Sequence, residues 1–206
     1  MNKMTGRSLY SIGEAYSILY NGIRSMRYMK ASLANGTVTE QFKERTMLAV
    51  TEVNACPMCS YAHTKMALES DMTKDEINAM LVGTLDDTPP DELPGVLFAQ
   101  HYADMRAKPS KSSWQRLLQD YGKDKANGIL GVTRTIMLGN AYGIVIGSIK
   151  GRFKGEPDKR SSLVYELGML LTLPPFMLIA FLHVGIARLL RMPLISFESK
   201  TNGTVL

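Results

Sequence analysis

Apolar residues recur at steps of three and four in successive segments of the chain, and no segment alternates steadily between apolar and polar residues. The first such stripe consists of Leu9, Ile12, Tyr16, Leu19, Tyr20, Ile23 and Met26. This period places apolar side chains on one face of an amphipathic helix, whereas a half-buried strand requires a period of two. The pattern therefore predicts an all-α fold.

Turn and capping residues divide this pattern into helices. Thr37 with Glu40, and Thr73 with Glu76, have the spacing of a capping box, and Asn54 is a good N-cap for a further helix. The first helix carries the stripe at residues 9–26 and precedes a turn at Asn35-Gly36. The further expected helices cover about 37–53, 55–69, 73–85, 96–106, a short segment capped by Ser113, residues 123–150 and an apolar stretch from 163 onward.

Composition excludes several other classes of protein. Charged residues make up 21% of the chain, close to the ordinary globular share of about 25%, and two cysteines are too few for a disulfide-rich secreted scaffold. The net charge is +5, and the densest basic run, residues 150–160, also contains acidic residues. We therefore expect no nucleic-acid binding. The first 20 residues lack the pattern of a signal peptide, so a cytoplasmic protein is expected.

Residues 167–187 contain no Asp, Glu, Lys or Arg. This stretch of 21 residues is long enough to span a bilayer as a helix, which takes roughly 20 residues. Pro174 and Pro175 interrupt it, remove two backbone donors and leave carbonyls that would need partners in lipid. We therefore expect two core helices that meet at a proline corner, or a subunit interface, with a membrane span as the alternative. His101 and His183 each lie alone in an apolar stretch and are expected to be hydrogen-bonded packing residues.

Both cysteines of the protein lie in one CxxC motif, Cys56 and Cys59, and His63 follows four residues later. Residues at i and i+4 share one face of a helix, so Cys59 and His63 should be neighbours. Cys56 lies near a helix N-terminus, where free N–H groups and the helix dipole favour a thiolate. Glu44 lies on the preceding helix and can reach His63 if the two helices are antiparallel.

These four residues suit redox chemistry. His63 can accept the proton of Cys59, and Glu44 can orient the imidazole and stabilise its cation. Attack of a thiolate on a peroxide oxygen gives a sulfenic acid, and the neighbouring thiol then closes a disulfide. An external dithiol reopens that disulfide by exchange.

Other interpretations of the CxxC motif fit less well. A structural zinc site needs four ligands, and Cys56, Cys59 and His63 supply three, so no metal is predicted. A c-type haem site needs histidine directly after the second cysteine, where Ser60 stands. Inert buried thiols would not explain the neighbouring histidine. A thioredoxin-like arrangement would make residues 46–53 a strand, but it requires further strands that the sequence does not show.

Glu44, Cys56, Cys59 and His63 resemble the motif of the AhpD-like alkylhydroperoxidase group within the carboxymuconolactone decarboxylase-like family. The helix start at residues 72–77 also resembles the family pattern. The resemblance covers roughly residues 42–85 and, more loosely, 96–106. It implies an all-helical fold that assembles as trimers or hexamers and works without a cofactor.

The same resemblance implies roles for the four residues. Cys59 would attack the hydroperoxide, Cys56 would resolve the sulfenic acid, and Glu44 with His63 would relay protons. Cys56 would lie nearer the surface and meet the reductant, a dithiol or a protein-bound dihydrolipoyl group. The chain departs from AhpD itself in having Met58 where a histidine precedes the second cysteine, which removes one relay group.

We expect a single domain over residues 1–206, with a redox core at about 37–106 and a C-terminal helical extension at about 123–195. The predicted function is that of a thiol-dependent peroxidase or thiol–disulfide oxidoreductase that forms homo-oligomers. Decarboxylation is disfavoured because the family's decarboxylases do not rely on a CxxC pair. The alternative is a redox-switch interaction protein, associated with a membrane through its C-terminal apolar stretch.

Overall fold

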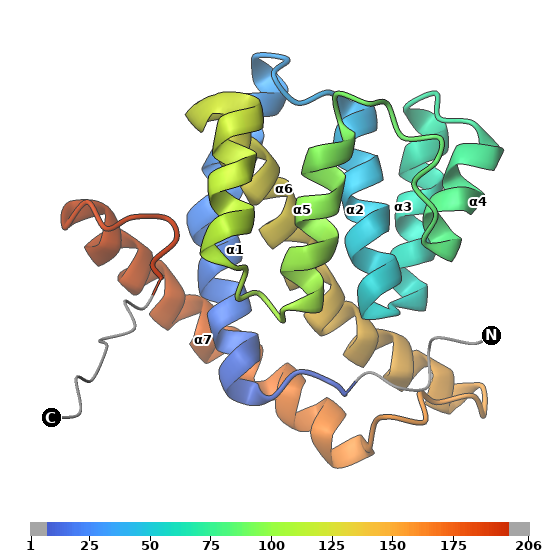
Figure 1. Ribbon diagram of the computed structural model, residues 1–206. Coiled ribbons are helices and arrows are strands. Elements are labelled where there is room, and N and C mark those ends of the chain that lie inside the picture. Colours follow the sequence, from blue (N-terminus) through green and yellow to red (C-terminus); the bar gives the residue numbers. More distant parts are fainter. Residues whose placement is uncertain (1–7, 198–206) are drawn as a thin grey trace, which may run out of the picture.

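The computed structural model describes residues 8–197. Within this part of the chain there are seven helices and no strand, so the predicted all-α fold is confirmed (Figure 1). In chain order the helices are α1 (Ile12–Ala34), α2 (Glu40–Asn54), α3 (Pro57–Glu69), α4 (Lys74–Val82), α5 (Leu93–Asp104), α6 (Lys111–Phe153) and α7 (Leu163–Leu189).

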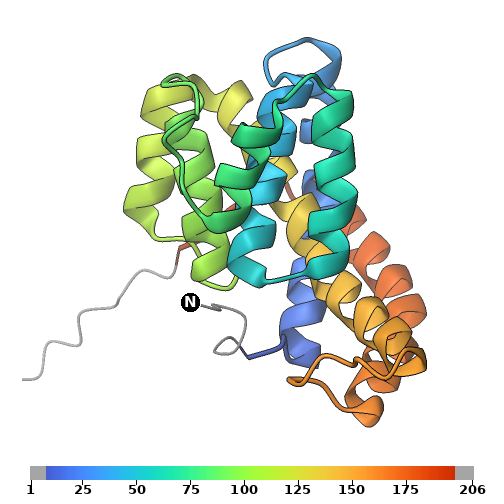
Figure 2. The ribbon, with the colours of Figure 1, turned by 90° about the vertical axis from the view of Figure 1, so that its right-hand side faces the viewer.

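Helix α6 forms the centre of the molecule, because it packs against α1, α2, α3, α5 and α7. Figure 1 shows α5, α2 and α3 side by side, with α7 crossing the lower end of α1. The side view in Figure 2 places α7 beside the C-terminal half of α6. Since α2 and α3 both pack on α6, residues of α6 can reach the turn that joins them.

Helix α2 begins later than the capping box at Thr37 predicted. Its N-cap is Thr39, whose hydroxyl accepts a hydrogen bond from the backbone N–H of Phe42. Thr37 is instead engaged in the preceding turn, where its hydroxyl donates to the Asn35 side chain at 2.8 Å. Residues 46–53 lie within α2 and are therefore helical, so the thioredoxin-like alternative, which makes them a strand, is wrong. This part of α2 is buried on nearly all sides.

The other helix boundaries lie close to their predicted positions. The capping box of Thr73 and Glu76 is present at the start of α4, which ends at Val82 because Gly83 takes a left-handed conformation (φ 84°). Helix α5 begins three residues earlier than expected, since Pro94 fits a first helical turn.

The predicted short helix and long helix before residue 150 are joined in α6. Ser110, not Ser113, is the N-cap, and it accepts from the N–H of Ser113. The two predicted segments meet at Gly122, whose φ of 69° is non-helical and produces a kink. The expected boundary near residue 123 is therefore a bend within one element.

The predicted proline corner in the last apolar stretch is wrong, because α7 continues through Pro174 and Pro175 as one helix. Both prolines lie on the exposed side of α7, so the carbonyls of Leu170 and Leu171 that lose a partner can be hydrated. The expectation that this stretch is core is also wrong within the chain. Only a narrow stripe is buried, which includes Met169, and the other positions of the helix are partly or fully exposed.

The two isolated histidines have hydrogen-bond partners, as expected. The backbone N–H of Ser110 donates to Nε2 of His101 at 3.2 Å. The hydroxyl of Tyr16 is hydrogen-bonded to Nδ1 of His183 at 2.5 Å, which links α1 to α7. Both histidines therefore connect packed elements.

A buried carboxylate anchors the start of α7 and predicts acid sensitivity. Arg152 donates to Glu166 at 2.7 Å and Ser148 donates to it at 2.6 Å, and these bonds lower the pKa of Glu166 to about 2. A carboxyl with a lowered pKa in the folded state stabilises the fold fully above its unfolded pKa, near 4.5. That contribution is lost as the pH falls from about 4.5 towards about 2. We expect Glu166→Gln to lower the urea midpoint at pH 7 and to weaken its decline towards pH 3.

The matched control for this prediction is Glu156→Gln, since Glu156 is exposed. Equal loss of stability between pH 7 and pH 3 in Glu166→Gln and the unaltered protein would contradict it.

Candidate redox site

The CxxC motif lies at the N-terminus of α3, and Cys56 itself is the N-cap. The expected N-cap, Asn54, is instead the last residue of α2, and its side chain accepts a 2.6 Å hydrogen bond from the Tyr10 hydroxyl. Ala55 takes a left-handed conformation (φ 51°) and reverses the chain between α2 and α3. Sγ of Cys56 accepts the backbone N–H of Cys59 at 3.3 Å, so this sulfur receives one of the free donors of the helix start.

Cys56 and Cys59 are joined by a disulfide. The two cysteines and Ile144 of α6 form a buried group, here called the disulfide cluster. A Cβ on Gly143 would lie 2.7 Å from Sγ of Cys59 and 3.2 Å from Sγ of Cys56. Only a glycine therefore allows α6 to pack this closely on both sulfurs, and the sequence carried no local signal for that role.

The two cysteines differ in exposure, in the opposite sense to that implied by the resemblance. Cys56 has 0% exposure and Cys59 has 7%. The expectation that Cys56 lies nearer the surface is therefore wrong for this chain. Both sulfurs lie against Gly143 of α6, and Cys56, as the N-cap, also adjoins the turn at Ala55.

The structure brings Glu44 and His63 together, as the antiparallel arrangement of α2 and α3 allows. Oε2 of Glu44 lies 2.8 Å from Nδ1 of His63, and the Glu44 side chain is 1% exposed. Oε1 of Glu44 lies 3.0 Å from Nζ of Lys43, a neighbour that sequence reasoning missed. A carboxylate with a cation on one oxygen and an imidazole on the other can orient the ring and stabilise its protonated form.

Arg160 holds the turn before the disulfide from the far side. Its Nη2 donates to the carbonyl oxygen of Ala55 at 3.1 Å, and its guanidinium also pairs with Asp158. This pairing lowers the pKa of the Asp158 carboxyl. The sequence showed residues 150–160 only as a basic run that also contains acidic residues, but Arg160 in this run fixes the backbone beside Cys56.

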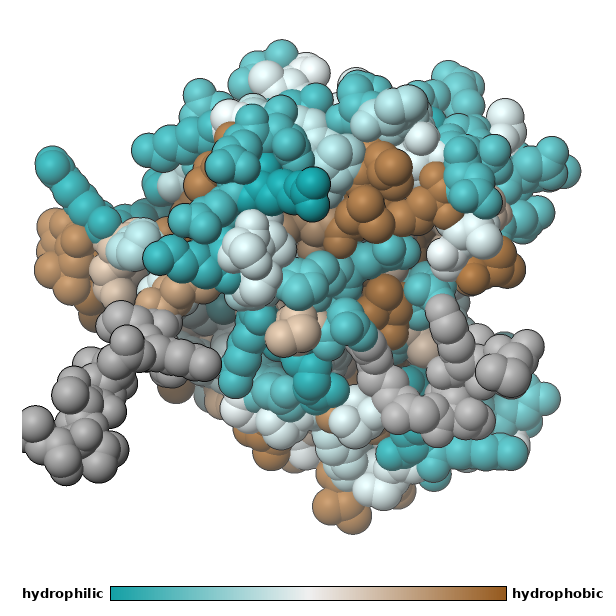
Figure 3. All heavy atoms as spheres, viewed as in Figure 1, coloured by the Kyte–Doolittle hydropathy of each residue, from teal (hydrophilic) through white to brown (hydrophobic). Residues whose placement is uncertain are grey.

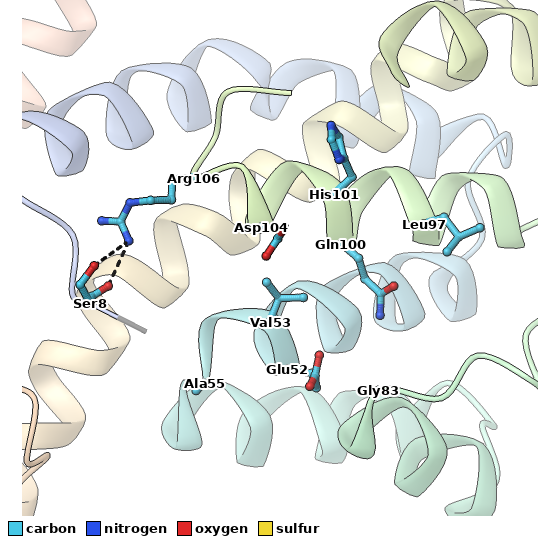
Figure 4. Close-up of a pocket in the computed structure, with 10 residues that line it drawn as sticks. All are labelled: Ser8, Glu52, Val53, Ala55, Gly83, Leu97, Gln100, His101, Asp104 and Arg106. Carbon is cyan, nitrogen blue, oxygen red and sulfur yellow. Dashed lines mark hydrogen bonds between the residues drawn. The ribbon is translucent and has the colours of Figure 1, made fainter. Parts of the chain in front are cut away.

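The N-terminal segment before α1 also borders the site. Arg106 donates to the carbonyl oxygens of Ser8 at 3.0 Å and of Leu9 at 3.1 Å. Ser8, Ala55 and Arg106 line a cavity of about 750 Å³ between the ends of α2, α4 and α5 (Figure 4). Leu9 packs against the disulfide cluster. Residues 8–9 therefore border this cavity on one side and the disulfide cluster on the other.

Among residues 8–197, no group of three or more His, Cys, Asp or Glu side chains is placed to hold a metal ion. The chemistry that the arrangement offers is that of a dithiol–disulfide pair beside a carboxylate–histidine pair. An all-helical protein with a CxxC disulfide at a helix N-terminus is the class that fold and site define.

Residues 24–87 match the model of the carboxymuconolactone decarboxylase family. This segment contains Glu44, Cys56, Cys59 and His63, so the recognition of this family from the sequence is confirmed there. The matched segment ends before α5, α6 and α7. No curated protein and no solved structure matches the chain.

Proposed function

We propose that the protein is a thiol-dependent oxidoreductase that cycles Cys56 and Cys59 between dithiol and disulfide, with a hydroperoxide as the oxidant. The observation that carries this proposal is the disulfide at the start of α3 beside the Glu44–His63 pair. The family match supports it, since that family includes enzymes. A cycle of this kind suits the cytoplasm, where reduced thiols are supplied.

Each step of the proposed cycle balances. The thiolate of Cys59 attacks the terminal peroxide oxygen, the O–O bond breaks, and the products are a sulfenic acid and, after protonation, an alcohol or water. The thiol of Cys56 then attacks that sulfur and releases water as the disulfide forms. An external dithiol reduces the disulfide and is itself oxidised. His63, oriented by Glu44, takes the proton from Cys59.

The test is stopped-flow mixing of dithiol-reduced protein with hydrogen peroxide or an organic hydroperoxide, followed by mass spectrometry. The expected result is loss of one peroxide per chain and a gain of the Cys56–Cys59 disulfide. Peroxide that is consumed no faster than in buffer would overturn the peroxidase proposal and leave plain thiol–disulfide exchange.

We also propose that copies of this chain associate through α7. Beyond its first turn, its exposed large apolar side chains are Leu167, Leu171, Leu178, Ile179, Phe181, Leu182, Ile186 and Leu189. Figure 3 shows apolar atoms at the outer end of this helix, on the left of the view. Together these side chains offer on the order of 500 Å² or more of apolar surface, which is at least at the upper end of the largest patches on monomers, about 300–600 Å², and approaches the area of about 800 Å² that each partner contributes to a protein interface.

A second copy suits this surface better than a bilayer does. Helices α6 and α7 are both long and apolar enough to cross a membrane, but most of the apolar part of α6 is buried. Both ends of α7 are tied to the body, by Glu166 at one end and by Arg134, which donates to the carbonyl of Leu194, at the other. Residues 167–187 also lack the Lys and Arg of helices that lie on lipid surfaces. A second copy presents the same apolar face, as a two-fold interface requires.

We expect the double variant Leu178→Glu, Leu182→Glu to convert an oligomer into a monomer, because burying two carboxylates in an apolar interface is costly. The measurement is molecular mass by light scattering during size-exclusion chromatography. Val82→Glu is the matched control, since Val82 is 69% exposed on α4. A monomeric unaltered protein, or one that sediments with lipid vesicles through α7, would contradict the proposal.

A further inference from the structure

We propose that the reducing thiol attacks Sγ of Cys59, and that Cys56 leaves as the thiolate. This assignment rests on the proposed redox function and concerns the reductive half of the cycle. It reverses the roles in reduction that the family resemblance implied, in which Cys56 meets the reductant.

Access is the first argument. Thiol–disulfide exchange depends on which sulfur the incoming thiolate can reach. Cys56 has no exposed surface, whereas Cys59 retains 7%. On the side of Cys56, the turn is fixed by the bond from Arg160 to the carbonyl of Ala55. An incoming thiol therefore meets Cys59 first.

The leaving sulfur is the second argument. Exchange is faster when the departing thiolate is the more stable one. Cys56 is the N-cap of α3, and its sulfur already accepts the backbone N–H of Cys59. A negative charge on this sulfur is stabilised by that bond and by the positive end of the helix dipole. Cys59 lies inside the first turn and faces the carbonyl oxygen of Gly139 at 3.7 Å, which does not stabilise an anion.

Atoms and electrons balance in this route. The thiolate of an external dithiol bonds to Sγ of Cys59, the Cys56–Cys59 bond breaks, and Cys56 takes the electron pair. The second thiol of the reductant then attacks the reductant's first sulfur, which is bonded to Cys59 in the mixed disulfide, and Cys59 is released. The reductant becomes a disulfide, and its two protons end on the two cysteines.

Sulfite tests the point of attack, because it opens a disulfide in the same way and leaves a stable S-sulfonate on the attacked sulfur. The oxidised full-length protein is treated with sulfite under native conditions, acidified, desalted and alkylated with iodoacetamide. Peptide mass spectrometry then locates the sulfonate and the alkyl group. A parallel reaction with glutathione, quenched in acid, uses a thiol as the probe.

We expect the sulfonate and the glutathione on Cys59 in about ten-fold excess or more, with the alkyl group on Cys56 after sulfite treatment. Equal labelling, or labelling mainly of Cys56, would overturn the proposal. The same reaction in denaturant is the control and should label both cysteines to a similar extent. No peroxide is present in this experiment, so its outcome is independent of the peroxide assay.

Discussion

Cys59→Ser is expected to reduce peroxide consumption to the rate of buffer alone, while Cys56→Ser should consume one peroxide per chain and stop. Cys59 lies one helical turn before His63, whose Nδ1 lies 2.8 Å from Oε2 of Glu44, so under the proposed function His63 is the base for this thiol. Without Cys56 the sulfenic acid on Cys59 has no resolving thiol. The measurement is peroxide loss over time by protein that is reduced beforehand and freed of dithiol, because free dithiol would itself react with the sulfenic acid. Mass spectrometry then distinguishes the Cys56–Cys59 disulfide of the unaltered protein from the oxidised Cys59 of Cys56→Ser.

The matched control is Ser60→Ala, which alters the same turn of α3 and leaves both thiols in place. Full turnover by Cys59→Ser would contradict the proposed role of this residue. One turnover by Cys59→Ser and none by Cys56→Ser would assign the attack on peroxide to Cys56 instead.

Gly143→Ala is expected to destabilise the oxidised protein by about 1–3 kcal/mol, the usual cost of an extra methyl group in a packed core. The new Cβ would lie 2.7 Å from Sγ of Cys59, and a disulfide at a helix start cannot move away freely. The measurement is the urea unfolding free energy of the oxidised protein.

Gly139→Ala provides the control, because Gly139 lies one turn earlier on α6 and its new Cβ would lie 3.7 Å from Cδ1 of Ile136, an ordinary van der Waals distance. This change should be neutral or should stabilise by up to about 1 kcal/mol through helix propensity. Equal unfolding free energies for the two variants would show that α6 does not constrain the disulfide.

Much of the fold followed from local patterns. The capping box at Thr73 and the breaks near residues 34 and 123 were visible because they depend on residues within one turn of each other. The start of α2 was misplaced because Thr37 and Thr39 can both cap, and only the hydrogen bond from Thr37 to Asn35 decides between them. The prediction of a proline corner was wrong because Pro174 and Pro175 lie on the exposed side of α7, and the apolar periodicity does not reveal this.

As with the fold, the part of the candidate site that depends on local spacing was predictable from the sequence. The spacing of Cys56, Cys59 and His63 placed them at the start of one helix, and Glu44 was expected within reach. The contributions of Gly143 and Arg160 were not predictable, since a glycine in an apolar helix and an arginine in a charged loop are common features without a local signature.

By itself, the sequence determined the helical class, the approximate positions of the helices and the order of the redox residues, because these depend on hydrogen bonds and side-chain periodicity over three or four residues. The tertiary structure alone decided that Cys56 is more deeply buried than Cys59 and that α6 packs on both sulfurs. It also decided that α7 leaves its apolar surface exposed. The packing of α6 on the sulfurs joins residues more than 80 positions apart, and all of these features depend on the whole arrangement of helices and not on any one segment.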